Sequence, residues 1–153
     1  MTEDELIAAI GARVGSTDVP VGIGDDAAVL EDGLVVSVDA LIEGTHFVRG
    51  WLSLSEMGYR GTVTALSDLA AMGASPRAIL SSLACPDGSE GDAVMEGVAL
   101  AASEFGAALV GGNVARSEAI ALHTTVIGRA PANPWLRGGA RVGDTIYVTE
   151  RIL

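Results

Sequence analysis

The sequence contains no lysine: its nine basic residues are all arginine, they stand against twenty Asp and Glu, and the formal net charge is −11. Without lysine the chain cannot form a P-loop of the type G-x-x-x-x-G-K-[ST], nor the lysine-dependent parts of the protein-kinase signature. A nucleic-acid backbone is bound by clustered Lys and Arg, which an acidic chain does not offer. The composition therefore predicts no nucleic-acid partner and no lysine-based phosphate site.

Cysteine, aromatic residues and long apolar runs are also scarce. The one cysteine, Cys85, excludes an internal disulfide and lies in an apolar run, where a buried small side chain is expected rather than a nucleophile. Aromatic residues make up 4%, so the core must consist of Ala, Val, Leu and Ile. No apolar stretch of about 18 residues and no basic N-terminal region occurs, which predicts neither a membrane span nor a signal peptide. The expectation is a cytoplasmic protein of one domain.

The apolar pattern predicts helices and strands that alternate along the chain. Helices are expected at 2–14, 53–72 and 89–105, and strands at 27–31, 34–41, 77–85, 107–110, 120–127 and 145–149. Thr2 and Glu5 stand at the spacing of a capping box, and Asp32-Gly33 indicates a tight turn between two strands. This order predicts an α/β or α+β fold with a mixed sheet flanked by helices.

Several Asp residues stand in segments that are otherwise small or apolar. Asp25 and Asp26 lie in a Gly-rich segment, Asp39 closes a predicted strand, and Asp68 lies among the apolar residues of a predicted helix. Carboxylates in such places are costly unless a positive group meets them. An oxygen-rich site suits a hard cation such as Mg²⁺, which usually also binds phosphates. The sequence therefore points to nucleotide chemistry at an Mg²⁺ site.

Each of these carboxylates also has a simpler interpretation. The segment 22–27 is most readily an ordinary turn when taken alone, and it does not fit a dinucleotide motif because it precedes a strand instead of opening a helix. Asp39 is as consistent with an exposed polar face as with a ligand, although Ser37 faces the same side of the strand. For Asp68 the alternative is a local hydrogen-bonding role, but its apolar helix neighbours favour a functional carboxylate.

Three further features are candidates for ligand binding. Gly111, Gly112 and Asn113 follow a predicted strand and would allow a ligand close to the backbone, or would form a turn. Arg137 begins a basic, Gly-rich loop and can grip a phosphate with two parallel hydrogen bonds, although a plain surface loop is an equal alternative. His46, in an irregular connection, is the more exposed of the two histidines and the better functional candidate.

Taken together, these segments resemble the N-terminal domain of the thiamine-monophosphate kinase family. The order and spacing of the motifs match through nearly the whole chain. The resemblance rests on Gly22-Ile-Gly-Asp-Asp-Ala-Ala28, Ser37-Val-Asp-Ala-Leu-Ile-Glu-Gly-Thr-His-Phe47, Leu66-Ser-Asp-Leu-Ala-Ala-Met-Gly-Ala74, Val110-Gly-Gly-Asn113 and Gly139-Ala-Arg-Val-Gly-Asp-Thr-Ile-Tyr-Val-Thr149. The wider superfamily includes aminoimidazole-ribotide synthetase, whose N-terminal domain fold is implied for residues 1–153.

The resemblance implies transfer of the γ-phosphoryl group of ATP to thiamine monophosphate, with several Mg²⁺ ions around the phosphates. By motif position, it implies metal ligands at Asp26, Ser37, Asp39 and Asp68, with Asp25 in support. Gly112 and Asn113 would contact nucleotide or metal, Arg137 would contact ATP, and His46 would face the thiamine substrate. No general base is implied, because the phosphate acceptor is already anionic. A homodimer that pairs through the sheet is also implied.

The chain departs from the family pattern in three places. Val38 stands where the family usually has Thr, and Asn113 stands where it often has Asp. The Val38 backbone carbonyl and the Asn113 amide oxygen would each bind a metal ion more weakly than the residues usual in the family. The chain also ends at Leu153, where the family continues into a C-terminal domain, so we expect the isolated chain to be weakly active or inactive. The alternatives are a non-catalytic nucleotide-binding or dimerisation module, and a related enzyme such as a selenophosphate synthetase, which would require an N-terminal Cys and Lys.

Overall fold

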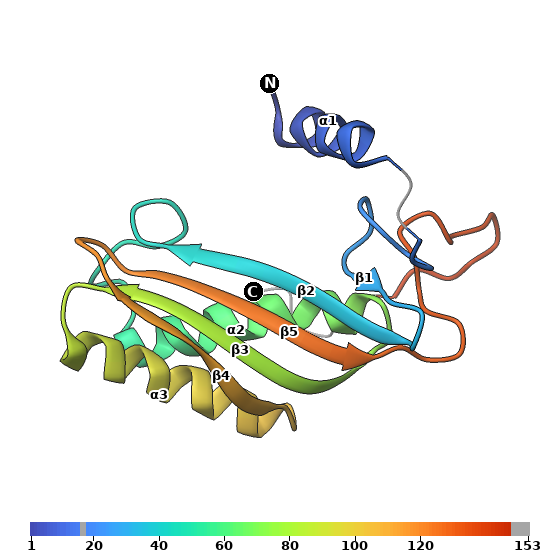
Figure 1. The fold of residues 1–153 in the computed structure, drawn as a ribbon. Helices are drawn as coiled ribbons and strands as arrows, with labels where there is room; N and C mark the ends of the chain where they lie inside the picture. Colours follow the sequence, from blue (N-terminus) through green and yellow to red (C-terminus); the bar gives the residue numbers. More distant parts are fainter. Residues whose placement is uncertain (16–17, 148–153) are drawn as a thin grey trace.

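A five-stranded mixed sheet forms the centre of the structure (Figure 1). The computed structural model describes residues 1–15 and 18–147. The strands are β1 (Ala28–Val29), β2 (Leu34–Ile42), β3 (Ser75–Cys85), β4 (Ala108–Arg116) and β5 (Ala121–Arg129), in the spatial order β1-β2-β5-β3-β4. β3 and β4 run parallel, and the neighbouring pairs on the other side of β3 are antiparallel. The predicted mixed α/β class is confirmed.

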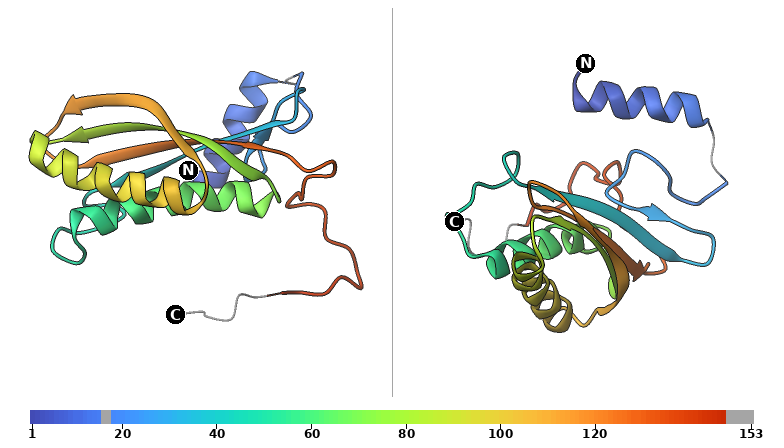
Figure 2. Two further views of the ribbon diagram at one scale, coloured as in Figure 1. Left: turned by 90° about the horizontal axis from the view of Figure 1, so that it is seen from below. Right: turned by 60° about the vertical axis from the view of Figure 1, so that its left-hand side comes forward.

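Two long helices, α2 (Leu54–Ala71) and α3 (Gly88–Glu104), cover the same face of this sheet (Figure 2). The sheet curves around them, and among the described residues only α1, which stands apart, lies on the side of the opposite face. α2 begins at Ser53, whose hydroxyl accepts a hydrogen bond from the Glu56 amide while the Glu56 carboxylate accepts one from the Ser53 amide. Asp87 caps α3 because its carboxylate accepts hydrogen bonds from the amides of Ser89 and Glu90. The helices predicted at 53–72 and 89–105 are confirmed.

The third helix, α1 (Glu3–Val14), lies apart from the body of the domain and buries none of its residues (Figure 1). The predicted capping box is present, since the Thr2 hydroxyl accepts from the Glu5 amide and the Glu5 carboxylate accepts from the Thr2 amide. Gly15 ends the helix with φ 75°. Local capping therefore determines both ends of α1 without help from tertiary packing.

Aliphatic residues between the sheet and the two helices form the core, as the low aromatic content predicts. One cluster surrounds Leu69, Met72, Ile79 and Val126, and a second surrounds Leu83, Val94, Val98 and Leu122. Cys85 belongs to the second cluster and is 4% exposed, which confirms its structural role. Small residues on α2 and α3 let the two helix backbones approach closely at Gly58 and Gly97.

β4 is longer than the sequence predicted. The prediction was a short buried strand at 107–110 that ended at the glycines, but β4 continues to Arg116 and all of its residues are exposed. The register along β3 passes from Ile79 opposite Leu109 to Leu80 opposite Gly111, so Val110 is an extra residue. The glycines therefore mark a β-bulge inside an edge strand rather than a strand end.

The strand predicted at 145–149 is not observed in its described part. Residues 145–147 form no strand and are exposed, and 148–149 lie outside the described residues. No strand from the described chain pairs with this segment, so its β-forming sequence has no partner. In the described part of the chain, no helix is both long enough and apolar enough to cross a membrane.

Candidate functional site

A hydrogen-bond network joins three of the residues that the sequence singled out. Ser37, in the middle of β2, donates from its hydroxyl to the Asp68 carboxylate over 2.6 Å, and its oxygen lies 3.3 Å from the carbonyl oxygen of Asp26. Asp68 lies in the last turn of α2. Three segments that are distant in sequence thus place oxygen atoms around one point on the helix-covered face of the sheet.

Asp68 lies in an environment that disfavours its charged form. Its helix neighbours Ala65, Leu69 and Met72 are all buried, as predicted. Desolvation raises the pKa of Asp68, and the nearby carboxylates of Asp39 and Asp26 raise it further, whereas the Ser37 hydrogen bond and the Arg137 charge lower it. The site therefore concentrates negative charge that its own residues only partly compensate.

Asp39 and His46 line a small cavity next to this network. The cavity measures about 160 Å³ and is bounded by β2, the loop that follows β2, and the residues Arg60, Gly61 and Thr64 of α2. Asp39 alternates with Val38, so its side chain shares a face with Ser37, as predicted, and one of its carboxylate oxygens accepts from the Ala40 amide at 2.7 Å. The structure thus brings the predicted metal-binding and substrate-facing residues Asp39 and His46 to one cavity.

Arg137 reaches the same site from the segment that follows β5. Its guanidinium donates to one carboxylate oxygen of Asp26 from Nε (2.8 Å) and from Nη2 (2.6 Å), and its backbone amide lies 3.3 Å from both carboxylate oxygens of Asp25. The ion pair raises the pKa of Arg137. The Arg137 side chain is 65% exposed, so this pair contributes little to stability and is free to exchange partners.

The end of α2 explains how Arg137 arrives there. Gly73 stops the helix with φ 68°, a conformation that favours glycine. The Trp135 amide donates to the Met72 carbonyl at 3.2 Å, and the Trp135 ring lies against Gly73, where a Cβ would come within 3.3 Å of it. This contact directs the chain so that Arg137 follows two residues later beside the Asp25-Asp26 segment.

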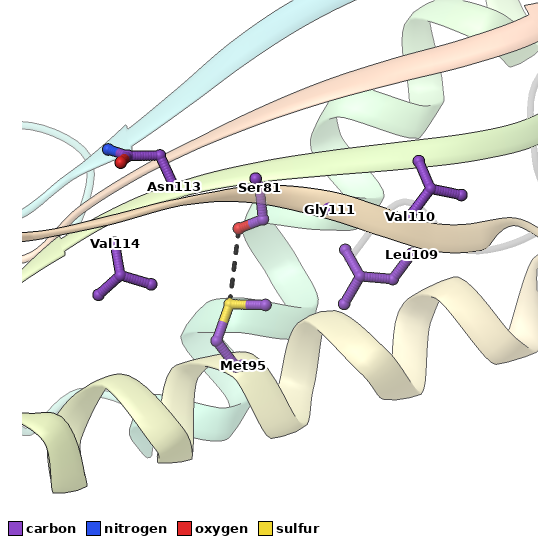
Figure 3. A pocket seen from close by; sticks show the side chains of 8 residues that line it. Ser81, Met95, Leu109, Val110, Gly111, Asn113 and Val114 are labelled. Atoms are coloured by element: carbon purple, nitrogen blue, oxygen red, sulfur yellow. Dashed lines mark hydrogen bonds between the residues drawn. The ribbon is translucent and has the colours of Figure 1, made fainter.

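Gly112 and Asn113 lie elsewhere. Two strands, β5 and β3, separate β4 from β2, which corresponds to about 14 Å at the usual strand spacing. Figure 3 shows the Asn113 side chain pointing away from α3, whereas Ser81 points toward Met95 of α3. Val38 also points to the open face and is 64% exposed. The side chains of Asn113 and Asp39 therefore do not meet in this chain, and Asn113 remains a predicted ligand only for a separate ion or for nucleotide.

A larger cavity adjoins Gly112 and Asn113. It measures about 510 Å³ and lies between α3 and the bulged part of β4 (Figure 3). The residues that line it are Ser81, Met95, Leu109, Val110, Gly111, Gly112, Asn113 and Val114. Gly112 has φ 155°, and a Cβ there would lie 2.6 Å from the Ser81 carbonyl carbon, so only glycine fits. The sequence predicted that a ligand would approach the backbone of these glycines closely, but in the structure it is β3 that approaches Gly112.

The donor set at Ser37, Asp68 and Asp26 fits a hard cation that keeps part of its own coordination shell. Among residues 1–15 and 18–147, no three His, Cys, Asp or Glu side chains are grouped so as to enclose a metal ion. Mg²⁺, however, is commonly held by one or two carboxylates together with waters and substrate phosphates rather than by an all-protein cage. A hydroxyl, a backbone carbonyl and carboxylates that repel one another match that mode of binding.

Sequence reasoning missed two groups of residues near the site. Arg60 and Thr64 line the cavity of Asp39, one helical turn apart on α2. The available signal was that Arg60, Thr64 and Asp68 follow one another at intervals of four residues, which places all three along one side of a helix. Arg49 forms ion pairs with Glu43 and Glu90 beside the loop of His46. The only indication of these ion pairs in the sequence was that Glu43 and Arg49 carry opposite charges six residues apart in a short connection.

Comparison with known proteins shows the family of this chain. The sequence model described as AIR synthase related protein, N-terminal domain, matches residues 24–130, from the Gly-Asp-Asp segment to the end of β5. The chain belongs to the family of AIR synthase related proteins. The match includes the predicted site residues Asp26, Ser37, Asp39, Asp68 and Asn113, whereas Arg137 lies outside it.

Several thiamine-monophosphate kinases are similar to this chain. The enzyme of Methanopyrus kandleri is 34% identical over 154 residues, with 96% of this chain and 48% of the relative covered. That of Bacillus subtilis is 36% identical over 162 residues, with 99% and 50% covered. A solved structure described as AaThiL complexed with AMPPCP and TMP superposes with a TM-score of 0.82 at 32% identity, covering 93% of this chain and 46% of that one. The chain thus spans about half the length of these relatives.

Proposed function

We propose that this chain is the nucleotide- and Mg²⁺-binding half of a thiamine-monophosphate kinase, which transfers the γ-phosphoryl group of ATP to thiamine monophosphate. The observation that carries the proposal is the convergence of Ser37, Asp68 and Asp26 on one point beside the Arg137 guanidinium. The similar protein described as complexed with AMPPCP and TMP supports the two substrates. The similarity to thiamine-monophosphate kinases supports the reaction class.

The residues of the chain supply charge and orientation rather than acid–base chemistry. Two phosphates must be brought in line, and their mutual repulsion is the main obstacle. Arg137 would leave Asp26 and bind a phosphate through its planar guanidinium. Two phosphate oxygens match the paired N–H donors of the guanidinium better than a single carboxylate oxygen does. Ser37, with its hydroxyl held by Asp68, would keep that carboxylate turned toward the site. Asp26, Ser37, Asp39 and Asp68 would hold Mg²⁺, which compensates phosphate charge when bound.

The proposal also covers predicted site residues outside the network of Ser37, Asp68 and Asp26. His46 is proposed to contact the thiamine substrate, because it lines the cavity of Asp39 and is exposed at its mouth. Gly112 is proposed to contact nucleotide from the large cavity beside β4. Asn113 is proposed to contact nucleotide or a further ion on the side of β4 that faces away from α3. Asn113 offers a neutral side-chain oxygen, and Val38 can offer a metal ion only its backbone carbonyl oxygen. We therefore propose weak metal ligation at both positions.

Calorimetric titration of ATP into the purified chain tests the nucleotide site. With Mg²⁺ present we expect saturable binding to the chain, and without it we expect none, since the carboxylates alone repel the triphosphate. Asp39→Asn should abolish the Mg²⁺-dependent signal, whereas Asp92→Asn, the same change at an exposed position of α3, should leave it intact. Binding of equal strength with and without Mg²⁺ would contradict the proposed site, provided that circular dichroism shows a folded chain.

We also propose that two copies pair through the open face of the sheet. In the described part of the chain, neither α2 nor α3 covers that face, which exposes Val38 (64%), Val110 (60%) and Leu80 (36%). An apolar sheet face without a cover favours association. We expect sedimentation equilibrium to give twice the chain mass of 15.5 kDa, and Val38→Asp to shift the chain toward monomer by placing a charge in the interface. A monomer at all concentrations would be the contrary result.

The second candidate is a nucleotide-binding or dimerisation module without turnover. The observation in its favour is that Val38 and Asn113, the two residues that differ from the family pattern, both lie on the open face away from Asp39. ATP binding in the calorimetric experiment combined with a lack of phosphoryl transfer, measured as ADP release in the presence of thiamine monophosphate, would favour this module over the kinase.

A further inference from the structure

Arg49 connects the two ends of the loop that carries His46 with the first turn of α3. Its Nε donates to Glu43 at 2.6 Å, and its Nη1 donates to Glu90 at 2.7 Å. Glu43 opens the loop that follows β2, Arg49 lies near the end of that loop, and Glu90 is in the first turn of α3. One guanidinium therefore closes the loop upon itself and ties it to a helix from another part of the fold.

Glu43 is also fixed from the other side. Its second carboxylate oxygen accepts from the Ile120 amide at 2.9 Å, and its own amide donates to the Ile120 carbonyl at 2.9 Å. The Arg49 hydrogen bond, followed by the Ile120 hydrogen bond, lowers the pKa of Glu43, so the carboxylate is charged at neutral pH. Its side chain is only 20% exposed. Ion pairs that share a charge in a partly buried network hold geometry better than isolated surface pairs do.

The loop held in this way presents His46. The Ile42 amide donates to Nδ1 of the His46 imidazole at 3.0 Å, and the His46 amide donates back to the Ile42 carbonyl at 2.8 Å. An amide N–H can only donate, so Nδ1 must be the unprotonated nitrogen and the proton of the neutral ring must be on Nε2. The Gly44 amide donates to the Phe47 carbonyl, and Phe47 is buried, which completes the turn.

We propose that Arg49 is a positioning residue for His46: by joining Glu43 to Glu90 it holds the loop so that Ile42 keeps the imidazole in the Nε2–H form. His46 then offers a hydrogen-bond donor, and not an acceptor, at the mouth of the cavity that Asp39 lines. A fixed donor of this kind favours an anionic or carbonyl-bearing group on the ligand. The inference depends on the loop and its contacts and does not require the proposed kinase reaction.

Nitrogen NMR of the imidazole rings tests this arrangement in the intact chain. The sequence contains only two histidines, so His123→Gln assigns the remaining signals to His46. At a pH where the ring is neutral, we expect Nδ1 of His46 to resonate as an unprotonated nitrogen and Nε2 as a protonated one. In Arg49→Gln we expect both signals to move toward the average of the two tautomers, and the Ile42 amide to exchange with solvent about tenfold faster.

The controls separate positioning from general stability. Arg13→Gln removes an arginine from α1, whose residues are not buried, and should leave the His46 signals unchanged. Arg49→Lys can pair with one carboxylate at a time and should restore the tautomer in part. Glu90→Gln, which removes only the anchor on α3, provides the test if Arg49→Gln does not fold. Unchanged His46 signals and Ile42 exchange in folded Arg49→Gln, or in Glu90→Gln in its place, would overturn the proposal.

Discussion

Gly97→Ala should lower the free energy of unfolding by about 3 kcal/mol or more, at or beyond the upper end of the usual range for overpacking. An ideal Cβ at Gly97 would lie 2.6 Å from the Tyr59 nitrogen and closer still to the Ser55 carbonyl oxygen. Both are backbone atoms of α2, which cannot turn aside as a side chain can. α2 and α3 must therefore separate along their whole contact, and the aliphatic core between them and the sheet must open.

Chemical denaturation of Gly97→Ala measures this effect, and two further glycines make the comparison sharp. Gly58→Ala should be similarly destabilising, because its Cβ would lie 2.9 Å from the Val94 carbonyl carbon. Gly11→Ala in α1 meets no atom within 4 Å and should leave the transition of the domain in place, since alanine only improves helix propensity there. If Gly97→Ala unfolded at the same denaturant concentration as Gly11→Ala, the close crossing of α2 and α3 would be wrong.

Asp68→Asn should have opposite effects on binding and on stability. The change keeps the size of the side chain and removes one charge from a site where Asp39 and Asp26 are also negative. We expect Mg²⁺-dependent ATP binding to weaken by about a hundredfold or more, at or beyond the upper end of the range seen when groups that support a metal ligand are lost. The thermal midpoint at neutral pH should rise, since an incompletely compensated carboxylate is no longer present.

The pH dependence of that gain follows from the direction of the pKa shift. The pKa of Asp68 is raised in the fold above its ordinary value of 3.8, so between these two values the folded chain holds a proton that the unfolded chain has lost. The contribution of Asp68 to stability is thus greatest below pH 3.8, falls as the pH rises to the folded pKa, and stays low above it. Asp68→Asn should therefore be more stable than the parent at pH 7, with the difference shrinking as the pH falls toward 3.8.

Thermal unfolding followed by circular dichroism across this pH range is the measurement. Asp92→Asn makes the same chemical change at an exposed position of α3 and should show no comparable gain at pH 7. An Asp68→Asn variant that bound Mg²⁺-ATP like the parent would remove Asp68 from the proposed site. A variant less stable than the parent at pH 7 would mean that the Ser37 hydrogen bond outweighs the repulsion.

The capping boxes and helix stops illustrate what local sequence predicts well. Thr2 with Glu5 predicted the start of α1, and Gly73 predicted the end of α2, because hydrogen bonds within one turn decide both. The β4 edge strand shows where local reasoning failed. Its glycines were interpreted as a strand end, since a bulge depends on the register with β3, which no local pattern reports.

For the candidate site, the amino-acid sequence by itself determined the chemistry: several Asp residues in apolar surroundings, one basic, Gly-rich loop and no lysine. Those properties depend only on residue types and near neighbours. The tertiary structure decided the grouping. It joined Ser37 to Asp68 and brought Arg137 to Asp26 over more than a hundred residues, but it placed Asn113 on another strand and another face. Strand order and side-chain alternation arise from long-range pairing, which is why only the folded chain could show which ligands meet.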